Sequence, residues 1–220
     1  MTTTALLSLA FLSLFGGDAD RSDACPAPAA PVVEVLPLQP GFSVSHDRSR
    51  VELGAMIGQK AFPGFYTQGV TDVTYGSRIR IRLASSRLSD GRWCATARGV
   101  EAEFGLMLAA DVHIASEIAE GGCRYRTVLA HEMRHVAIAQ RAVLDGVGDA
   151  RSALEERLSR SPTFFGSDEA GATSALQSAL QEVVDRATKA RIASAEMENA
   201  SIDTRVSYEE LRDQCPGSPD

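Results

Sequence analysis

The hydrophobic periodicity of this 220-residue chain changes at the glycine pair Gly121-Gly122. Upstream, from residue 43 to about 115, the pattern has mainly a period of two, most clearly in Ser77–Leu83, where isoleucine and leucine alternate with three arginines. Such alternation indicates strands with one buried and one solvent-exposed face. Downstream, from Cys123, apolar residues recur at helical spacing. Strands followed by helices predict an α+β fold in which an antiparallel sheet or meander precedes the helices.

The first half of the chain is expected to begin with an extended segment. Residues 25–42 are rich in proline and form a lead-in, with one strand expected at Val32–Val35. A further strand is predicted within Leu106–Ser116. We expect a single α+β domain over residues 43–205, followed by a C-terminal tail at 206–220.

Three helices are predicted in the second half. Cys123 to about Leu144 contains neither glycine nor proline, so a helix is expected there, with Gly146 and Gly148 ending it. A short helix over Asp149–Arg160 should follow. After a loop, a long helix is predicted from about Thr173 to Ser201.

The N-terminus and the charge narrow the classes of function. Ala5–Phe15 is an apolar run of the length of a signal-peptide core, so residues 1–24 are predicted to be a signal peptide. Export to the periplasm or the medium follows, with no stable membrane insertion after cleavage. The formal net charge of -7 argues against a protein that binds nucleic acid.

Four cysteines are consistent with export. Outside the reducing cytosol, Cys25, Cys94, Cys123 and Cys215 are expected to form two disulfides, and three pairings are possible. We favour Cys94–Cys123, joining a strand to the start of a helix, and Cys25–Cys215, joining the two ends of the mature chain. The sequence contains no CxxC pair, so a thiolate zinc site is not supported.

The residues most informative about chemistry form the motif HExxH within the predicted helix. His131 and His135 are one helical turn apart, so both imidazoles project from one face and can reach a single zinc ion. Glu132 is placed to hold and deprotonate a water molecule whose pKa zinc lowers to about 7. With 4 histidines and 15 glutamates in the chain, about 0.005 chance matches are expected.

This region resembles the zincin metallopeptidases, whose active-site helix carries HExxH. More narrowly, the run from VHIASEIAEGGCRY to TVLAHEMRHV is similar to a group of uncharacterised bacterial secreted proteins predicted to be zinc-dependent proteases. The resemblance covers about residues 93–140, with a fainter similarity at 201–208. It implies one Zn²⁺ bound by His131 and His135, with Glu132 as the catalytic base. It also implies a strand at Asp111–Ser116 whose edge binds an extended substrate.

The third metal ligand is open. Ile138 and Arg141 stand where a metzincin would need glycine and histidine, which excludes that class. The remaining candidates are Glu182, Asp203, Glu196 and His113. Glu182 ranks slightly ahead of Asp203, because Glu182 and Asp185 approximate the ExxxD pattern of gluzincins.

Tyr125 and Tyr208 are both candidates to polarise an oxyanion, and their spacing favours neither. The leading hypothesis is an exported zinc metallopeptidase acting on a peptide or protein substrate. Two alternatives are a non-catalytic envelope protein that retains a zincin scaffold for binding, and a metal-dependent amidase acting on cell-wall peptides. The oligomeric state does not follow from these patterns.

Overall fold

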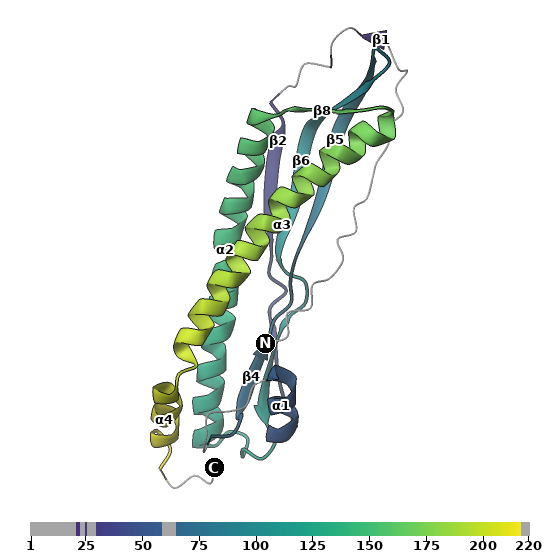
Figure 1. Cartoon of the computed structure of the whole chain (residues 1–220). Helices are drawn as coiled ribbons and strands as arrows, with labels where there is room; N and C mark the ends of the chain where they lie inside the picture. Colours follow the sequence, from purple (N-terminus) through teal and green to yellow (C-terminus); the bar gives the residue numbers. More distant parts are fainter. Residues whose placement is uncertain (1–20, 23–24, 26–29, 59–64, 217–220) are drawn as a thin grey trace.

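Two long helices dominate the computed structural model, which describes residues 21–22, 25, 30–58 and 65–216. The helices α2 (Cys123–Arg160) and α3 (Glu169–Ile202) lie side by side along a long sheet (Figure 1). Strands come first in the chain and long helices second, so the predicted α+β class is confirmed.

The long sheet is mixed, not antiparallel as expected. Its strands lie in the order β1 (Arg21–Ser22), β5 (Tyr75–Leu88), β6 (Trp93–Leu106) and β2 (Val32–Leu38), and β8 (Thr163–Gly166) also pairs with β6. β5 and β8 are antiparallel to β6, whereas β2 is parallel to it. Alternation of side chains is the same in parallel and antiparallel strands, so the pattern could not reveal this difference.

A second, smaller sheet lies at the end of the molecule that holds the start of α2. Its order is β3 (Phe42–Arg48), β7 (Ala110–Ala115) and β4 (Gly69–Asp72). β7 is parallel to β3 and antiparallel to β4, so it is the middle strand. β4 also contacts α2, and this contact places an edge of the small sheet beside the HExxH helix.

A short helix, α1 (Arg50–Ile57), interrupts the region expected to be mainly strands. Ser49 and Glu52 form a capping box at its start, in which each side chain satisfies a backbone N–H of the first turn. Leu53 is buried, and α1 contacts β4 and β7 of the small sheet. The capping-box spacing was the sequence signal for this helix.

The main core lies between the long sheet and the long helices. Val100, Ala102 and Phe104 alternate along β6 and are buried, as the period of two predicts. Leu154 of α2 and Leu180 of α3 are fully buried in the same core. The arginines between the apolar residues of β5 are exposed, which confirms the amphipathic strand.

The predicted break at Gly146 and Gly148 is wrong, because α2 continues without interruption to Arg160. Gly146 serves packing instead. A Cβ atom at this position would lie 2.0 Å from Cε1 of Phe104, so only glycine lets the helix approach the sheet this closely. The predicted short helix at 149–160 is therefore the second half of α2. The long C-terminal helix is confirmed as α3.

The expected C-terminal tail is also partly wrong, because most of it is helical. α4 (Arg205–Asp213) begins at the N-cap Thr204, whose hydroxyl accepts a hydrogen bond from the backbone N–H of Ser207. β8 likewise occupies part of the expected loop before α3. Residues 217–220 lie outside the described residues.

The disulfides join Cys25 to Cys94 and Cys123 to Cys215, so the favoured pairing is wrong. Cys94 lies in β6 opposite β8, whereas Cys123 is the first residue of α2. β8 and the start of α2 are at opposite ends of the molecule (Figure 1), which separates Cys94 from Cys123. Sequence could not rank the three pairings without this arrangement.

Two disulfides indicate that the protein matures in an oxidising compartment. Within the described residues, no helix is long and apolar enough to span a membrane. Nearly all of the predicted signal peptide (1–24) lies outside the described residues; Arg21–Ser22 pairs with β5 as β1.

Candidate metal centre

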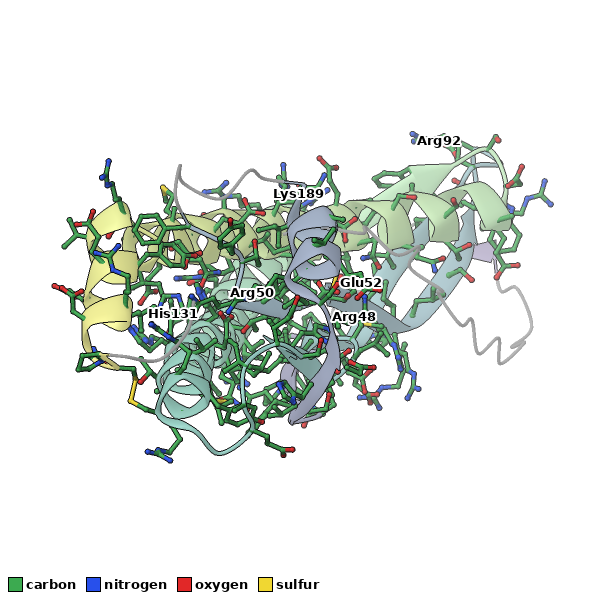
Figure 2. All side chains as sticks on the ribbon, turned by 90° about the horizontal axis from the view of Figure 1, so that it is seen from below. Arg48, Arg50, Glu52, Arg92, His131 and Lys189 are labelled. Atoms are coloured by element: carbon green, nitrogen blue, oxygen red, sulfur yellow. A yellow bond between two sulfur atoms is a disulfide. The ribbon has the colours of Figure 1, made fainter. Side chains whose placement is uncertain are left out.

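α2 places the two histidines of the motif on one buried face, as their spacing predicts. His131 and His135 are each 4% exposed. Their Nε2 atoms are 3.3 Å apart, so both nitrogens point toward the same small volume. His131 lies where α2 approaches α4 (Figure 2).

Asp203 completes a triangle of donor atoms with the histidines. Its Oδ1 atom is 3.0 Å from Nε2 of His131 and 3.1 Å from Nε2 of His135. A tetrahedral zinc ion with ligands at about 2.0–2.1 Å separates its ligand atoms by about 3.3–3.4 Å. The three observed separations are close to this value, and the donor set of two imidazoles and one carboxylate suits zinc. The side chains present therefore fit a bound metal ion.

The preference for Glu182 as the third ligand is wrong. Glu182 is 68% exposed at its side chain and forms an ion pair with Arg186, one turn away on α3. His113 instead has its Nδ1 atom 2.6 Å from the hydroxyl of Ser45. The fourth candidate, Glu196, is on the exposed face of α3, where its charge acts on Tyr75. Of the four candidates, the structure brings Asp203 to the histidines.

Asn199 orients one of the histidines from the last turns of α3. Nδ1 of His135 donates a hydrogen bond to Oδ1 of Asn199 over 2.8 Å. Because Nδ1 carries this proton, the neutral ring has its lone pair on Nε2 and could bind a metal ion there, whereas in the charged ring Nε2 also carries a proton and donates it to Asp203. Nδ1 of His131 is buried, and the described residues offer it no hydrogen-bond partner.

The charges of the cluster shift the pKa values of its members. Burial disfavours the charged form of Asp203, but hydrogen bonds from His131 and His135 outweigh burial and hold the pKa of Asp203 well below its usual range. Burial likewise disfavours a charged His135. The hydrogen bond to Asp203 and the charge of Glu132 outweigh this effect, so the pKa of His135 is raised. The cluster is therefore arranged to stabilise positive charge between its side chains.

Glu132 is buried beside the triangle in a defined orientation. Thr71 of β4 donates its hydroxyl proton over 2.8 Å to Oε2 of Glu132. Gly69 lies close to Oε1 of Glu132: a Cβ atom added to this glycine would be only 2.6 Å from that oxygen. Burial raises the pKa of Glu132, although the two histidines and the Thr71 hydrogen bond oppose this shift. His131, Glu132 and His135 together could hold a metal ion, since their ligand atoms lie within 4.8 Å of one another.

A pocket opens onto this cluster from the side of α4. It is lined by apolar and aromatic side chains, by backbone of β4 and by two arginines: Phe65, Tyr66, Gln68, Gly69, Arg124, Val128, Tyr208, Leu211 and Arg212, with His131 and Glu132 in its wall. The Tyr208 ring centroid is 5.9 Å from that of His131. Burial and the nearby Asp203 carboxylate raise the pKa of Tyr208 well above its usual range.

Of the two tyrosines left open by the sequence, the structure brings Tyr208 to the site. Tyr125 instead makes an edge-on contact with His46, at 5.4 Å between ring centroids. Tyr208 and Asp203 both come from the segment 201–208, at the end of α3 and the start of α4. The corner between α3 and α4 therefore supplies Asp203 to the site, and the first turn of α4 supplies Tyr208.

The expected substrate strand at Asp111–Ser116 is not an edge strand. It corresponds to β7, which is hydrogen-bonded to β3 on one side and to β4 on the other. Within the described residues the edge nearest the histidines is β4. β4 supplies Thr71 to Glu132 and Gly69 to the pocket.

Sequence reasoning missed Thr71 and Asn199. Thr71 could not be identified from sequence, because a single threonine in a strand belongs to no recognisable motif. Asn199 and Asp203 are four residues apart, like His131 and His135, so each helix presents a pair one turn apart to the other. This matched spacing of four residues was the sequence signal that could have indicated Asn199 and Asp203 as partners of the two histidines. Comparison of the chain with protein-family models, curated proteins and solved structures finds no match.

Proposed function

We propose that the protein is an exported, zinc-dependent metallopeptidase whose zinc is held by His131, His135 and Asp203. The convergence of these three buried or half-buried donor atoms at 3.0–3.3 Å carries the proposal. A zinc ion held there supplies Lewis-acid polarisation of an amide carbonyl and lowers the pKa of water to about 7. The two disulfides support an exported protein.

Glu132 is the proton acceptor in this proposal. Its Oε2 atom is occupied by the Thr71 hydroxyl, so Oε1, beside Gly69, is the oxygen that takes a proton and later returns it to the leaving amine. Burial raises the pKa of Glu132 and so makes its carboxylate a stronger base than an exposed one.

Tyr208 is the residue in the pocket wall best suited to donate a hydrogen bond to an oxyanion. Its ring lies close to His131, at 5.9 Å between ring centroids, so its hydroxyl belongs to the wall of the pocket nearest the histidines. An extended peptide is expected to pair with the edge of β4 that no described strand covers, and Gly69, the first residue of this strand, lines the pocket. The aromatic and aliphatic lining would receive a side chain next to the scissile bond.

Metal content and turnover together test the proposal. We expect one zinc per purified protein, and its loss in both His131→Ala and His135→Ala. The variant Glu132→Gln should keep the zinc but lose about 10²–10⁴-fold in turnover, because it removes only the proton acceptor. Protein that takes up no zinc when zinc is supplied would refute the proposal.

The same variants separate the two alternatives. A non-catalytic zincin scaffold would bind zinc, and Glu132→Gln would change no property of its partner binding. Casein and purified muropeptides, offered as parallel substrates, distinguish a peptidase acting on proteins from an amidase acting on cell-wall peptides.

A further inference from the structure

α4 forms one wall of the pocket, although it contributes no fully buried side chain to the hydrophobic core. Tyr208, Leu211 and Arg212 of α4 line the pocket, yet none of the residues of α4 is fully buried. A helix of nine residues with no buried side chain is not stable by itself. Its position must therefore come from its attachments to the rest of the molecule.

The attachments join α4 to both long helices. At its start, the corner at Asp203 and Thr204 connects α4 to α3. At its end, Cys215 is bonded to Cys123, the first residue of α2. Next to this bond, the buried guanidinium of Arg124 donates hydrogen bonds to the carbonyl oxygens of Leu211, over 3.0 Å, and of Arg212, over 3.4 Å. The disulfide and Arg124 thus hold the far end of the pocket wall.

We propose that the Cys123–Cys215 disulfide is a positioning element of the pocket, and that its reduction loosens α4 and weakens substrate binding while zinc is retained. The effect on substrate rests on the proposed function. Asp203 is the C-cap of α3, where its backbone N–H bonds to the carbonyl of Asn199. The third ligand is therefore held by α3, whereas Tyr208 depends on α4.

The disulfide is open to chemical attack on one side. Cys215 is 2% exposed, but Cys123 is an exposed residue, so we expect a reductant to attack the bond from the side of Cys123. With a phosphine, phosphorus donates two electrons to the S–S bond, and one water supplies the oxygen of the phosphine oxide and the protons of the two thiols. A phosphine suits this experiment because dithiols also chelate zinc.

The second disulfide provides a matched control. Cys25–Cys94 lies at the opposite end of the sheet and closes a loop of sequence separation 69, compared with 92 for Cys123–Cys215. Because the loop-closure entropy depends only weakly on length, removing either bond should affect the unfolded chain to a similar degree. Differences between the two variants then report on the pocket wall.

The test compares Cys123→Ser/Cys215→Ser with Cys25→Ser/Cys94→Ser by hydrogen exchange, zinc content and steady-state kinetics. In the first variant we expect exchange of the 205–214 amides to rise by about tenfold or more, and KM to rise more than kcat falls. Zinc should remain at one per protein in both. Phosphine treatment of folded wild-type protein should also raise exchange over 205–214, without any substitution. This treatment tests the proposal even if Cys123→Ser/Cys215→Ser does not fold.

Unchanged exchange over 205–214 after loss or reduction of Cys123–Cys215 would overturn the proposal, as would an equal change in the control variant. Hydrogen exchange needs neither zinc nor substrate. A wild-type protein without zinc or turnover would therefore refute the proposed function, while exchange over α4 would still decide the role of the disulfide.

Discussion

Asn199 accepts a hydrogen bond from Nδ1 of His135 over 2.8 Å, and this contact links α3 to the histidine pair on α2. Asn199 is 5% exposed and one turn before Asp203. One helix end therefore both orients a histidine and supplies a carboxylate. With its proton on Nδ1, the neutral ring of His135 leaves Nε2, the nitrogen beside Asp203, available to bind a metal ion.

Replacing Asn199 with leucine should weaken zinc binding by about 10–100-fold, because His135 loses the acceptor that fixes its orientation. Competition with a chelator of known affinity measures the change. Asn199→Asp is the matched control, because its carboxylate also accepts from Nδ1 and should retain most of the affinity. Equal affinities of the leucine variant and the wild type would show that Asn199 does not orient the ligand.

Gly69→Ala should reduce turnover while leaving the zinc content unchanged. The added Cβ would lie 2.6 Å from Oε1 of Glu132 and 2.8 Å from Cγ1 of Val128, so the carboxylate must move from its position beside Thr71. A displacement of this size is expected to cost about 10²-fold in kcat. Gly54→Ala is a suitable control, because its nearest neighbour would be at an ordinary 3.6 Å. Unaltered kcat in Gly69→Ala would contradict the assigned role of Glu132.

The histidine pair and the amphipathic strands could be predicted from sequence because both depend on local spacing. His131 and His135 must share a helix face, and the alternation in β5 and β6 requires one buried face. Neither prediction depends on how distant parts of the chain pack against these elements.

The third donor and the disulfide pairing could not be predicted, because both depend on how distant elements cross. Glu182 and Asp203 are on the same helix, and only the way α3 lies against α2 brings Asp203 to the histidines. In the same way, Cys94 and Cys123 are close in sequence but lie at opposite ends of the molecule. Spacing along the chain carries no information on either point.

Zinc-free protein should become more stable as the pH falls from about 8 toward 5. The pKa values of His135 and Glu132 are both raised in the folded state, so the folded protein binds more protons than the unfolded chain in this range. The stabilisation by His135 is complete below its unfolded pKa of about 6.5 and is lost as the pH rises through its folded pKa. The pKa of Asp203 is lowered, so its contribution is lost only at more acidic pH.

Zinc should reverse this dependence, because protons compete with the metal for the histidine nitrogens. The stability gained on adding zinc should therefore shrink as the pH falls over the same range. Denaturant titrations at several pH values, with zinc and with a chelator, measure both slopes. Parallel slopes in the two series would mean that the metal is not bound by these histidines.

Gly146 and Gly148, two residues apart in α2, should respond in opposite directions to replacement by alanine. At Gly146 the new Cβ would lie 2.0 Å from the Phe104 ring, and forcing helix and sheet apart should cost about 1–3 kcal/mol in free energy of unfolding. At Gly148 an added Cβ would contact no other part of the molecule within 4 Å, so alanine should stabilise the helix by about 0.5–1 kcal/mol through its better helix propensity. Denaturation by urea measures both changes. A helix that ended near residue 145, as the two glycines first indicated, would not give these opposite effects. Gly146 would then have no close contact with Phe104, and alanine at position 148 would gain nothing from helix propensity.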